Sequence, residues 1–303
     1  MLWSLDETAL DLFARRPVKG FCTGLRFVDD VVSGSAFAGG GSRAGTSDGF
    51  QPRQVVELCG NGATPKLLVL LHVVAAFLVK SLDDGKGDGD AEQKKGGHER
   101  ATLDRSNERV FLFDHEFEVD AHQLLQILHE KLQTRIPDAK QRHEAARSAM
   151  DRVVMYNCQD TFQCLATLNQ LHFELMDAPT TPLLLVFNCI SSFHAIDKER
   201  NPMAIPRKQP VGDGLALSEQ VFILLKQLSR HHSPIIFAAK ETPVNKSNGW
   251  EYSEFLPSSW TSQVSKRILL RPVQAQRLPD NARDAEEPAD TRFEAKCIVR
   301  GER

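Results

Sequence analysis

The sequence lacks a surplus of basic charge. Its 303 residues carry 37 Lys and Arg against 40 Asp and Glu, a formal net charge of −3. Domains that hold nucleic acid by bulk charge alone usually show a marked basic surplus, so that class is disfavoured. Apolar residues make up 41% of the chain, which is ordinary for a globular protein. A domain of this size buries about 75% of its unfolded surface, so its fold requires no disulfide or metal.

Paired cysteines and long hydrophobic runs are also missing. The six cysteines form no Cys-x-x-Cys pair, and Cys59 and Cys189 lie within apolar runs. This usage favours buried free thiols in a reducing compartment. The most apolar stretch, Leu67–Val79, contains His72 and is shorter than the roughly 20 residues that span a membrane. With no secretory signal at its start, the sequence predicts a soluble intracellular protein without a membrane partner.

Three polar segments interrupt the chain. Residues 34–49, 82–107 and 273–291 are rich in glycine, proline or charged residues. Such segments bury too little apolar area to offset their ordering entropy, so we interpret them as loops or insertions. They interrupt a predicted core over residues 21–303, which an amphipathic segment at residues 1–20 precedes.

Short apolar runs alternate with helical patterns between these segments. Five runs rich in Val, Ile and Phe, without polar alternation, predict strands buried on both faces: Gln54–Cys59, Val110–Asp114, Val153–Asn157, Leu183–Asn188 and Pro234–Ala239. Predicted helices follow at Leu67–Val79 and after the capping residues Asp120, Asp160 and Asp213. Four strand–helix units and a fifth strand predict an α/β fold with a mostly parallel, twisted sheet flanked by helices. Lys266–Leu270 and Phe293–Val299 predict a C-terminal hairpin at the sheet edge.

The segment after the first predicted strand partly matches a phosphate-binding loop. Gly60 and Lys66 fit the pattern G-x-x-x-x-G-K-[ST], with Gly62 and Thr64 between them. Pro65 replaces the second glycine and removes an N–H donor, and Leu67 replaces the hydroxyl residue that would hold Mg²⁺. A helix N-terminus with one lysine can still hold an anion. Two interpretations stay open: a weakened nucleotide loop, or an ordinary strand-to-helix turn with a surface lysine.

Polar residues follow three further predicted strands. Asn188 stands where a phosphate-loop ATPase has the aspartate that holds magnesium-bound water, and a neutral amide does this poorly. Glu116 lies where a water-activating base would be placed, although helix capping or a solvated loop would explain Asp114 and Glu116 equally well. Glu241 follows the last parallel strand, where a γ-phosphate sensor is expected, and it would repel phosphate unless Lys240 compensates.

These segments together resemble the RecA-type recombinase core, and in particular the eukaryotic recombinase paralogues of homologous recombination. The resemblance begins at Thr23-Gly24-Leu25 with Asp29-Asp30 and covers about residues 5–30 and 50–300 outside the insertions. It rests on the order and spacing of six segments: VVELCGNGATPK, VFLFDHEFEVDAHQLLQIL, LLLVFNCISSFHAID, IIFAAKETP, SSWTSQVSKRILLRP and FEAKCIV. It implies a RecA-like P-loop NTPase core.

The resemblance also implies roles for individual residues. It places the nucleotide on Gly60–Leu67, a magnesium carboxylate at Asn188, a catalytic base at Glu116 and a γ-phosphate sensor at Glu241. Pro65, Leu67 and Asn188 each remove a donor or magnesium ligand. We therefore expect a pseudo-ATPase, in which binding of ATP and Mg²⁺ is doubtful and hydrolysis is lost.

The family's two DNA-facing loops correspond to about Ala195–Leu215 and Pro243–Ser259. Basic residues beside aromatic ones in these loops suit contact with single-stranded or branched DNA: Lys198, Arg200, Arg207, Lys208, Lys246 and Trp250, with Tyr252 nearby. A solvated charged loop is the alternative, because the local basic surplus is small. DNA contact is therefore expected through a complex.

The first residues offer a candidate for partner binding. Leu2–Arg16 places apolar side chains on one helical face, which either packs on the core or docks a second recombinase paralogue. Three functions follow: a non-catalytic nuclear paralogue that assists recombinase assembly during double-strand-break repair, an active DNA-dependent ATPase, or a RecA-like regulatory module unrelated to DNA. No metal site is expected, since His115, His122 and His129 at a spacing of seven would lie about 10 Å apart along a helix.

Overall fold

The fold is built on one sheet of seven strands. The computed structural model describes residues 20–33, 49–80, 108–176, 182–200, 217–242, 252–272 and 293–299. The strand order is β3-β2-β4-β5-β1-β6-β7, and every pairing is parallel except that of β6 with β7. The strands are β1 Val55–Gly60, β2 Arg109–Phe113, β3 Val153–Tyr156, β4 Leu183–Phe187, β5 Ile235–Glu241, β6 Lys266–Pro272 and β7 Phe293–Val299. The predicted α/β fold, its mostly parallel sheet and its C-terminal edge hairpin are confirmed.

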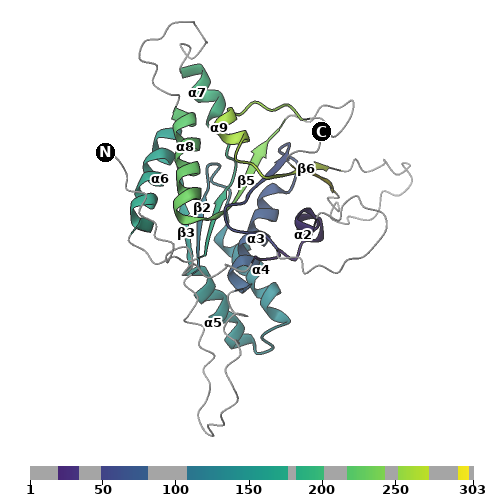
Figure 1. The fold of residues 1–303 in the computed structure, drawn as a ribbon. Coiled ribbons are helices and arrows are strands. Elements are labelled where there is room, and N and C mark those ends of the chain that lie inside the picture. Colours follow the sequence, from purple (N-terminus) through teal and green to yellow (C-terminus); the bar gives the residue numbers. More distant parts are fainter. Residues whose placement is uncertain are drawn as a thin grey trace, which may run out of the picture.

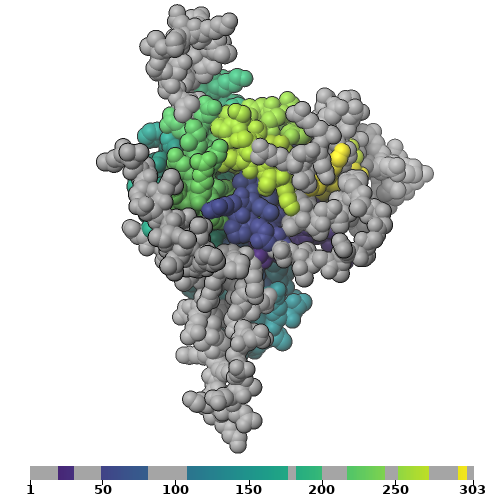
Figure 2. All heavy atoms as spheres, in the orientation of Figure 1, coloured from purple at the N-terminus to yellow at the C-terminus, as the bar shows by residue number. Residues whose placement is uncertain are grey.

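Helices cover both faces of this sheet (Figure 1). Helices α3 Lys66–Lys80, α4 Ala121–Gln133 and α5 Ala139–Met150 belong to one face, and α6 Thr161–Met176, α8 Leu217–His232 and α9 Ser258–Thr261 belong to the other. Two further helices are α2 Arg26–Ser33 and α7 His194–Arg200. In the space-filling view, α8 in green and residues 252–272 in yellow-green lie side by side on one surface (Figure 2).

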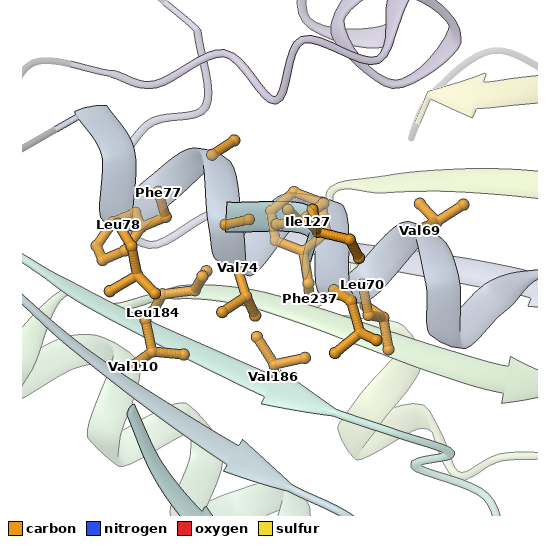
Figure 3. Packing of buried hydrophobic residues seen from close by; sticks show 14 of the residues in the cluster. Val69, Leu70, Val74, Phe77, Leu78, Val110, Ile127, Leu184, Val186 and Phe237 are labelled. Atoms are coloured by element: carbon orange, nitrogen blue, oxygen red, sulfur yellow. The ribbon is translucent and has the colours of Figure 1, made fainter. Parts of the chain in front are cut away.

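The central strands are apolar on both faces, because alternate residues pack into two separate hydrophobic cores. Even-numbered residues of β2 and β4 face one core, while odd-numbered residues face the other. Figure 3 shows the first core, where Val110, Leu184, Val186 and Phe237 of the sheet lie against Leu70, Val74 and Leu78 of α3. Burial of both faces explains why β2, β4 and β5 are continuous apolar runs without polar alternation.

Two of the three predicted caps lie in the described residues, and both are confirmed. Asp120 Oδ1 accepts a hydrogen bond from the backbone N–H of His122 at 2.8 Å, and Asp160 Oδ1 accepts one from Gln163 at 2.8 Å. Each bond satisfies a free N–H in the first helical turn. Asp213 lies outside the described residues.

The structure corrects one strand prediction and adds a helix. The run Val153–Asn157 was predicted to be buried on both faces, but β3 is the outermost strand beside β2, and Val154 and Met155 are exposed. An edge strand has a neighbour on one side only, so its apolar side chains are less covered. Helix α5 was not predicted, because its buried face consists of Ala145, Ala146 and Ala149 in an otherwise polar segment.

The segment before β1 is fixed by Asp29. Its carboxylate accepts hydrogen bonds from the backbone N–H groups of Thr23, at 2.7 Å, and Gly24, at 2.9 Å. Gly24 has φ +78°, a conformation that favours glycine, and Lys131 of α4 donates to the Thr23 carbonyl at 3.0 Å. These bonds give a physical reason for the Thr-Gly…Asp pattern at the start of the core.

The division of the chain at residue 20 stays a prediction. Residues 1–19 and nearly all of the predicted insertions lie outside the described residues, apart from Gly49 at the end of the first. Within the part of the chain that is described, no helix has the length and apolar character needed to cross a membrane.

Candidate functional site

The predicted site residues meet at the carboxyl ends of the parallel strands. Gly60 ends β1 and pairs in register with Glu241, which ends β5, and the N–H of Thr242 donates to the Gly60 carbonyl at 3.0 Å. Asn188 and Asp114 follow directly after β4 and β2, which are also paired. Open parallel sheets bind ligands at this edge. The structure therefore brings Gly60, Lys66, Asn188, Glu116 and Glu241 to one edge of the sheet.

Lys66 is turned into its own loop. The ammonium donates hydrogen bonds to the carbonyls of Asn61, at 2.6 Å, and Gly60, at 3.2 Å, and to Thr64 Oγ1 at 3.2 Å. The residue is buried, so the alternative of a surface lysine is wrong. A phosphate at this loop would have to compete with these three acceptors for the ammonium.

The two altered positions lie at the start of α3, with Pro65 just before the helix and Leu67 in its first turn. The carbonyl of Pro65 accepts the first bond of α3, from Val69 N–H at 3.0 Å, and proline suits a helix start because it needs no N–H partner there. Leu67 packs against the core beneath α3 and offers no oxygen to a magnesium ion. Gly60 leaves no space for a side chain, because a Cβ there would lie 2.4 Å from Thr64 Oγ1.

Asn188 is held by a neighbouring carboxylate. Its Nδ2 donates to Asp114 Oδ1 at 2.9 Å, and both side chains are buried. The second oxygen of Asp114 accepts from the Val119 N–H at 2.8 Å. Asp114 therefore orders the loop between β2 and α4, and the side-chain amide of Asn188 fixes the position of the Asp114 carboxylate.

Acidic groups surround the only lysine that the described residues place in this loop. Burial lowers the pKa of Lys66, while Glu241, the Cys189 thiol, Glu116 and Glu118 act in the opposite direction. Glu241 Oε1 lies 3.4 Å from the position that a Cβ on Gly62 would occupy, so its carboxylate borders the loop. Glu116 is exposed and accepts a hydrogen bond from Ser192 Oγ at 3.4 Å. The arrangement favours a cation over a phosphate group beside the loop.

The residues just after the strands have unusual backbone conformations. Cys189, after Asn188, has φ +76°, and Phe117, after Glu116, has φ +57°. Such conformations cost about 1–3 kcal/mol for residues other than glycine and are common at functional sites. Both lie at the edge of the sheet that carries the predicted site.

The candidate DNA contacts are only partly described. Lys198 is exposed on α7, and the backbone of Arg200 ends that helix. Arg207, Lys208, Lys246 and Trp250 lie outside the described residues. Tyr252 was predicted to be an exposed aromatic residue, but it is half-buried, and its hydroxyl accepts a hydrogen bond from Arg267 at 2.8 Å. Tyr252 therefore makes a contact within the fold, through its bond to Arg267.

A buried charge cluster on the α8 face was not predicted. Glu57 on β1 contacts Arg267 of β6 at 2.5 Å, Lys240 of β5 at 3.4 Å and the indole N–H of Trp260 at 2.6 Å. Lys240 also contacts Glu254 at 3.0 Å. The sequence contained a signal, because Glu57 and Lys240 are charged residues inside runs that are otherwise apolar. A second group, His115 with Cys158 and Cys164, was also missed, because His115 is far in the chain from the two cysteines.

Comparison with known proteins gives a limited set of similarities. No protein-family model matches the chain. The DNA repair protein XRCC2 homolog of Arabidopsis thaliana is 24% identical over 156 residues, which are 42% of this chain and 42% of that protein. The match thus spans about two fifths of the length of that curated relative. Among solved structures, the crystal structure of the RadB recombinase has 14% identity and a TM-score of 0.49, covering 84% of each chain.

The similarity to the XRCC2 homolog supports the resemblance found in the sequence. The chain is similar to RecA-family recombinase paralogues of the X-ray-repair cross-complementing group-two type. The segments FLFDHEFEVDAHQLLQIL and FNCISSFHAID carry this resemblance in the sequence.

Proposed function

We propose that this chain is a non-hydrolysing recombinase paralogue that acts in homologous-recombination repair of DNA double-strand breaks. In this role it joins other RecA-type paralogues in a nuclear complex and assists assembly of the recombinase on single-stranded or branched DNA. The chain's similarity to the XRCC2 homolog supports the repair role, since that relative is described as a DNA repair protein.

The loss of both magnesium ligands carries the non-catalytic part of the proposal. Leu67 packs into the core where a hydroxyl would be needed, and Asn188 donates its amide to Asp114 where a carboxylate would be needed. Phosphoryl transfer depends on a metal ion that neutralises the developing charge. ATP binding without turnover would require the Lys66 ammonium to exchange its bonds to the loop for a phosphate at the start of α3.

An ATPase assay with purified full-length protein tests this step. We expect no magnesium-dependent turnover above that of Lys66→Ala, with or without single-stranded DNA. A triple variant, Pro65→Gly with Leu67→Thr and Asn188→Asp, should gain magnesium-dependent ATP binding, because it restores one donor and two metal ligands. Wild-type turnover that Lys66→Ala abolishes would contradict the proposal and favour the second candidate, a DNA-dependent ATPase. That candidate is supported by Lys66 and Glu116, which lie at the same edge of the sheet.

Purification of the tagged protein from its own cells, with and without DNA breaks, tests the complex. We expect other RecA-type paralogues to co-purify and the tagged protein to be nuclear. A monomer without such partners would contradict the repair-complex proposal and leave a RecA-like regulatory module unrelated to DNA.

The assembled complex also tests the DNA contacts. Lys198→Glu with Arg200→Glu should weaken DNA binding by the complex, and the weakening should diminish at high salt. Lys140→Glu with Arg147→Glu reverses the same number of charges at exposed positions of α5 and should leave binding unchanged. Equal binding by both variants would remove residues 195–215 from the interface.

A further inference from the structure

Three side chains that commonly bind metals meet on the α6 face of the sheet. His115 follows β2, Cys158 lies between β3 and α6, and Cys164 is in the first turn of α6. One ligand atom from each lies within 4.8 Å of the other two, and all three residues are buried. Two thiols and an imidazole in one buried group form a donor set that transition metals prefer.

The imidazole of His115 has one ring nitrogen bonded and the other without a partner among the described residues. Its Nδ1 lies 3.0 Å from the carbonyl oxygen of Cys189, which can only accept, so Nδ1 carries the proton. In the neutral ring, Nε2 then has a free lone pair. Nε2 is buried and has no hydrogen-bond partner among the described residues. Metal-bound histidines usually have one ring nitrogen fixed in this way by a carbonyl or carboxylate.

The two thiols lie close enough to affect each other's pKa. Hydrogen bonding with Cys164 lowers the pKa of Cys158 to about 5 against the opposing effect of burial, and His115 acts in the same direction as Cys164. The pKa of Cys164 is correspondingly raised. Zinc binds sulfur as the thiolate, so uptake of the ion would release the remaining thiol protons.

We propose that His115, Cys158 and Cys164 form a zinc-binding site. Two sulfurs bound tetrahedrally to one zinc ion lie about 3.8 Å apart. Atoms that already lie within 4.8 Å of one another reach this spacing by shifts of about 1 Å or less. The set of two cysteines and one histidine occurs in zinc sites that leave the fourth position to water.

The surroundings accommodate a fourth ligand. A small pocket beside the cluster is lined by His115, Cys164, Thr161, Ile190, Phe193 and His194. A water molecule in this pocket would complete the coordination. The ion would join the β2–α4 connection to the β3–α6 connection, just beyond the pairing of β2 with β3.

Metal binding by the full-length protein tests this site. The protein is reduced with a phosphine, freed of metal and titrated with zinc against a coloured chelator, and in parallel with cobalt. We expect one zinc ion per chain and, with cobalt, a thiolate-to-metal charge-transfer band of a tetrahedral site. Cys158→Ser and Cys164→Ser should each weaken zinc binding by at least about a hundredfold, and His115→Phe should do the same. Cys22→Ser, at an exposed cysteine outside the cluster, should bind zinc like the wild type.

If the serine variants do not fold, alkylation of the cysteines in the wild-type protein, with and without zinc, still tests the site. Zinc should protect Cys158 and Cys164 of the wild-type protein from alkylation, as mapped by mass spectrometry, and should leave Cys22 reactive. Failure of the reduced wild-type protein to take up zinc would overturn the proposal. Cobalt binding without a thiolate band, or a Cys158–Cys164 disulfide with no zinc uptake after reduction, would overturn it as well.

Discussion

The buried charge cluster gives the sharpest prediction for stability. Replacing Lys240 by methionine keeps most of the side-chain volume and removes the ammonium that lies 3.4 Å from Glu57 and 3.0 Å from Glu254. Both Lys240 and Glu57 are fully buried. Glu57 would retain Arg267 and Trp260 but would lose its second cation, and Glu254 would lose a partner.

The size of the effect follows from the distance and the burial. Two charges 3.4 Å apart attract by about 5 kcal/mol at an effective dielectric constant of about 20. The loss is partly offset because the ammonium no longer has to be desolvated. Breaking one partner of a buried pair typically costs about 3–5 kcal/mol, and the remaining contacts of Glu57 place Lys240→Met near 3 kcal/mol.

Urea unfolding followed by far-ultraviolet circular dichroism measures this change. The matched control is Lys226→Met, an exposed lysine of α8, which should change the free energy of unfolding by less than about 0.5 kcal/mol. The double variant Glu57→Gln with Lys240→Met should lose less stability than the sum of the two single variants, by about 1–3 kcal/mol. A Lys240→Met protein as stable as the wild type, or strictly additive losses, would refute the reasoning.

Three further predictions concern the same fold. Burial raises the pKa of Glu57, but Lys240, Arg267 and Trp260 outweigh it and hold the pKa below its ordinary 4.5. Its stabilisation is therefore present above pH 4.5 and lost as the pH falls through the lowered value, so Glu57→Gln should flatten the acid limb of a pH–stability curve. Asp29→Ala removes the acceptor of the Thr23 and Gly24 N–H groups and should cost about 2 kcal/mol in urea unfolding, and no loss would contradict that role. Gly49→Ala should lower the melting temperature measurably, because Gly49 has φ +65° and its Cβ would lie 2.4 Å from the Phe21 carbonyl oxygen; an unchanged melting temperature would refute this close contact.

The fold was largely predictable because both faces of the central strands are buried. A run such as Leu183–Phe187 has no polar alternation, and that pattern identifies a covered parallel strand. Position within the sheet was not predictable in the same way, since the edge strand β3 is as apolar in sequence as its neighbours. Helix α5 was not predicted because its buried face consists of alanines, which give only a weak hydrophobic periodicity in the sequence.

The meeting of the candidate site residues at one edge of the sheet was predictable, but their contacts were not. Parallel pairing puts Gly60, Glu241, Asn188 and Asp114 at one edge, so strand order alone brings them together. The bond of Asn188 to Asp114 joins residues 74 positions apart and depends on their rotamers, which no local pattern encodes. The same holds for Glu57 and Arg267, which are 210 positions apart.

The contacts of Thr242 and Glu254 have a consequence for how this protein can change in evolution. The first is fixed to Gly60 of β1, and the second to Lys240 and Arg267. Through these contacts the two residues hold β1, β5 and β6 to one another. A change of either residue would disturb more than one strand, so both positions are less free to vary than an exposed residue such as Lys226.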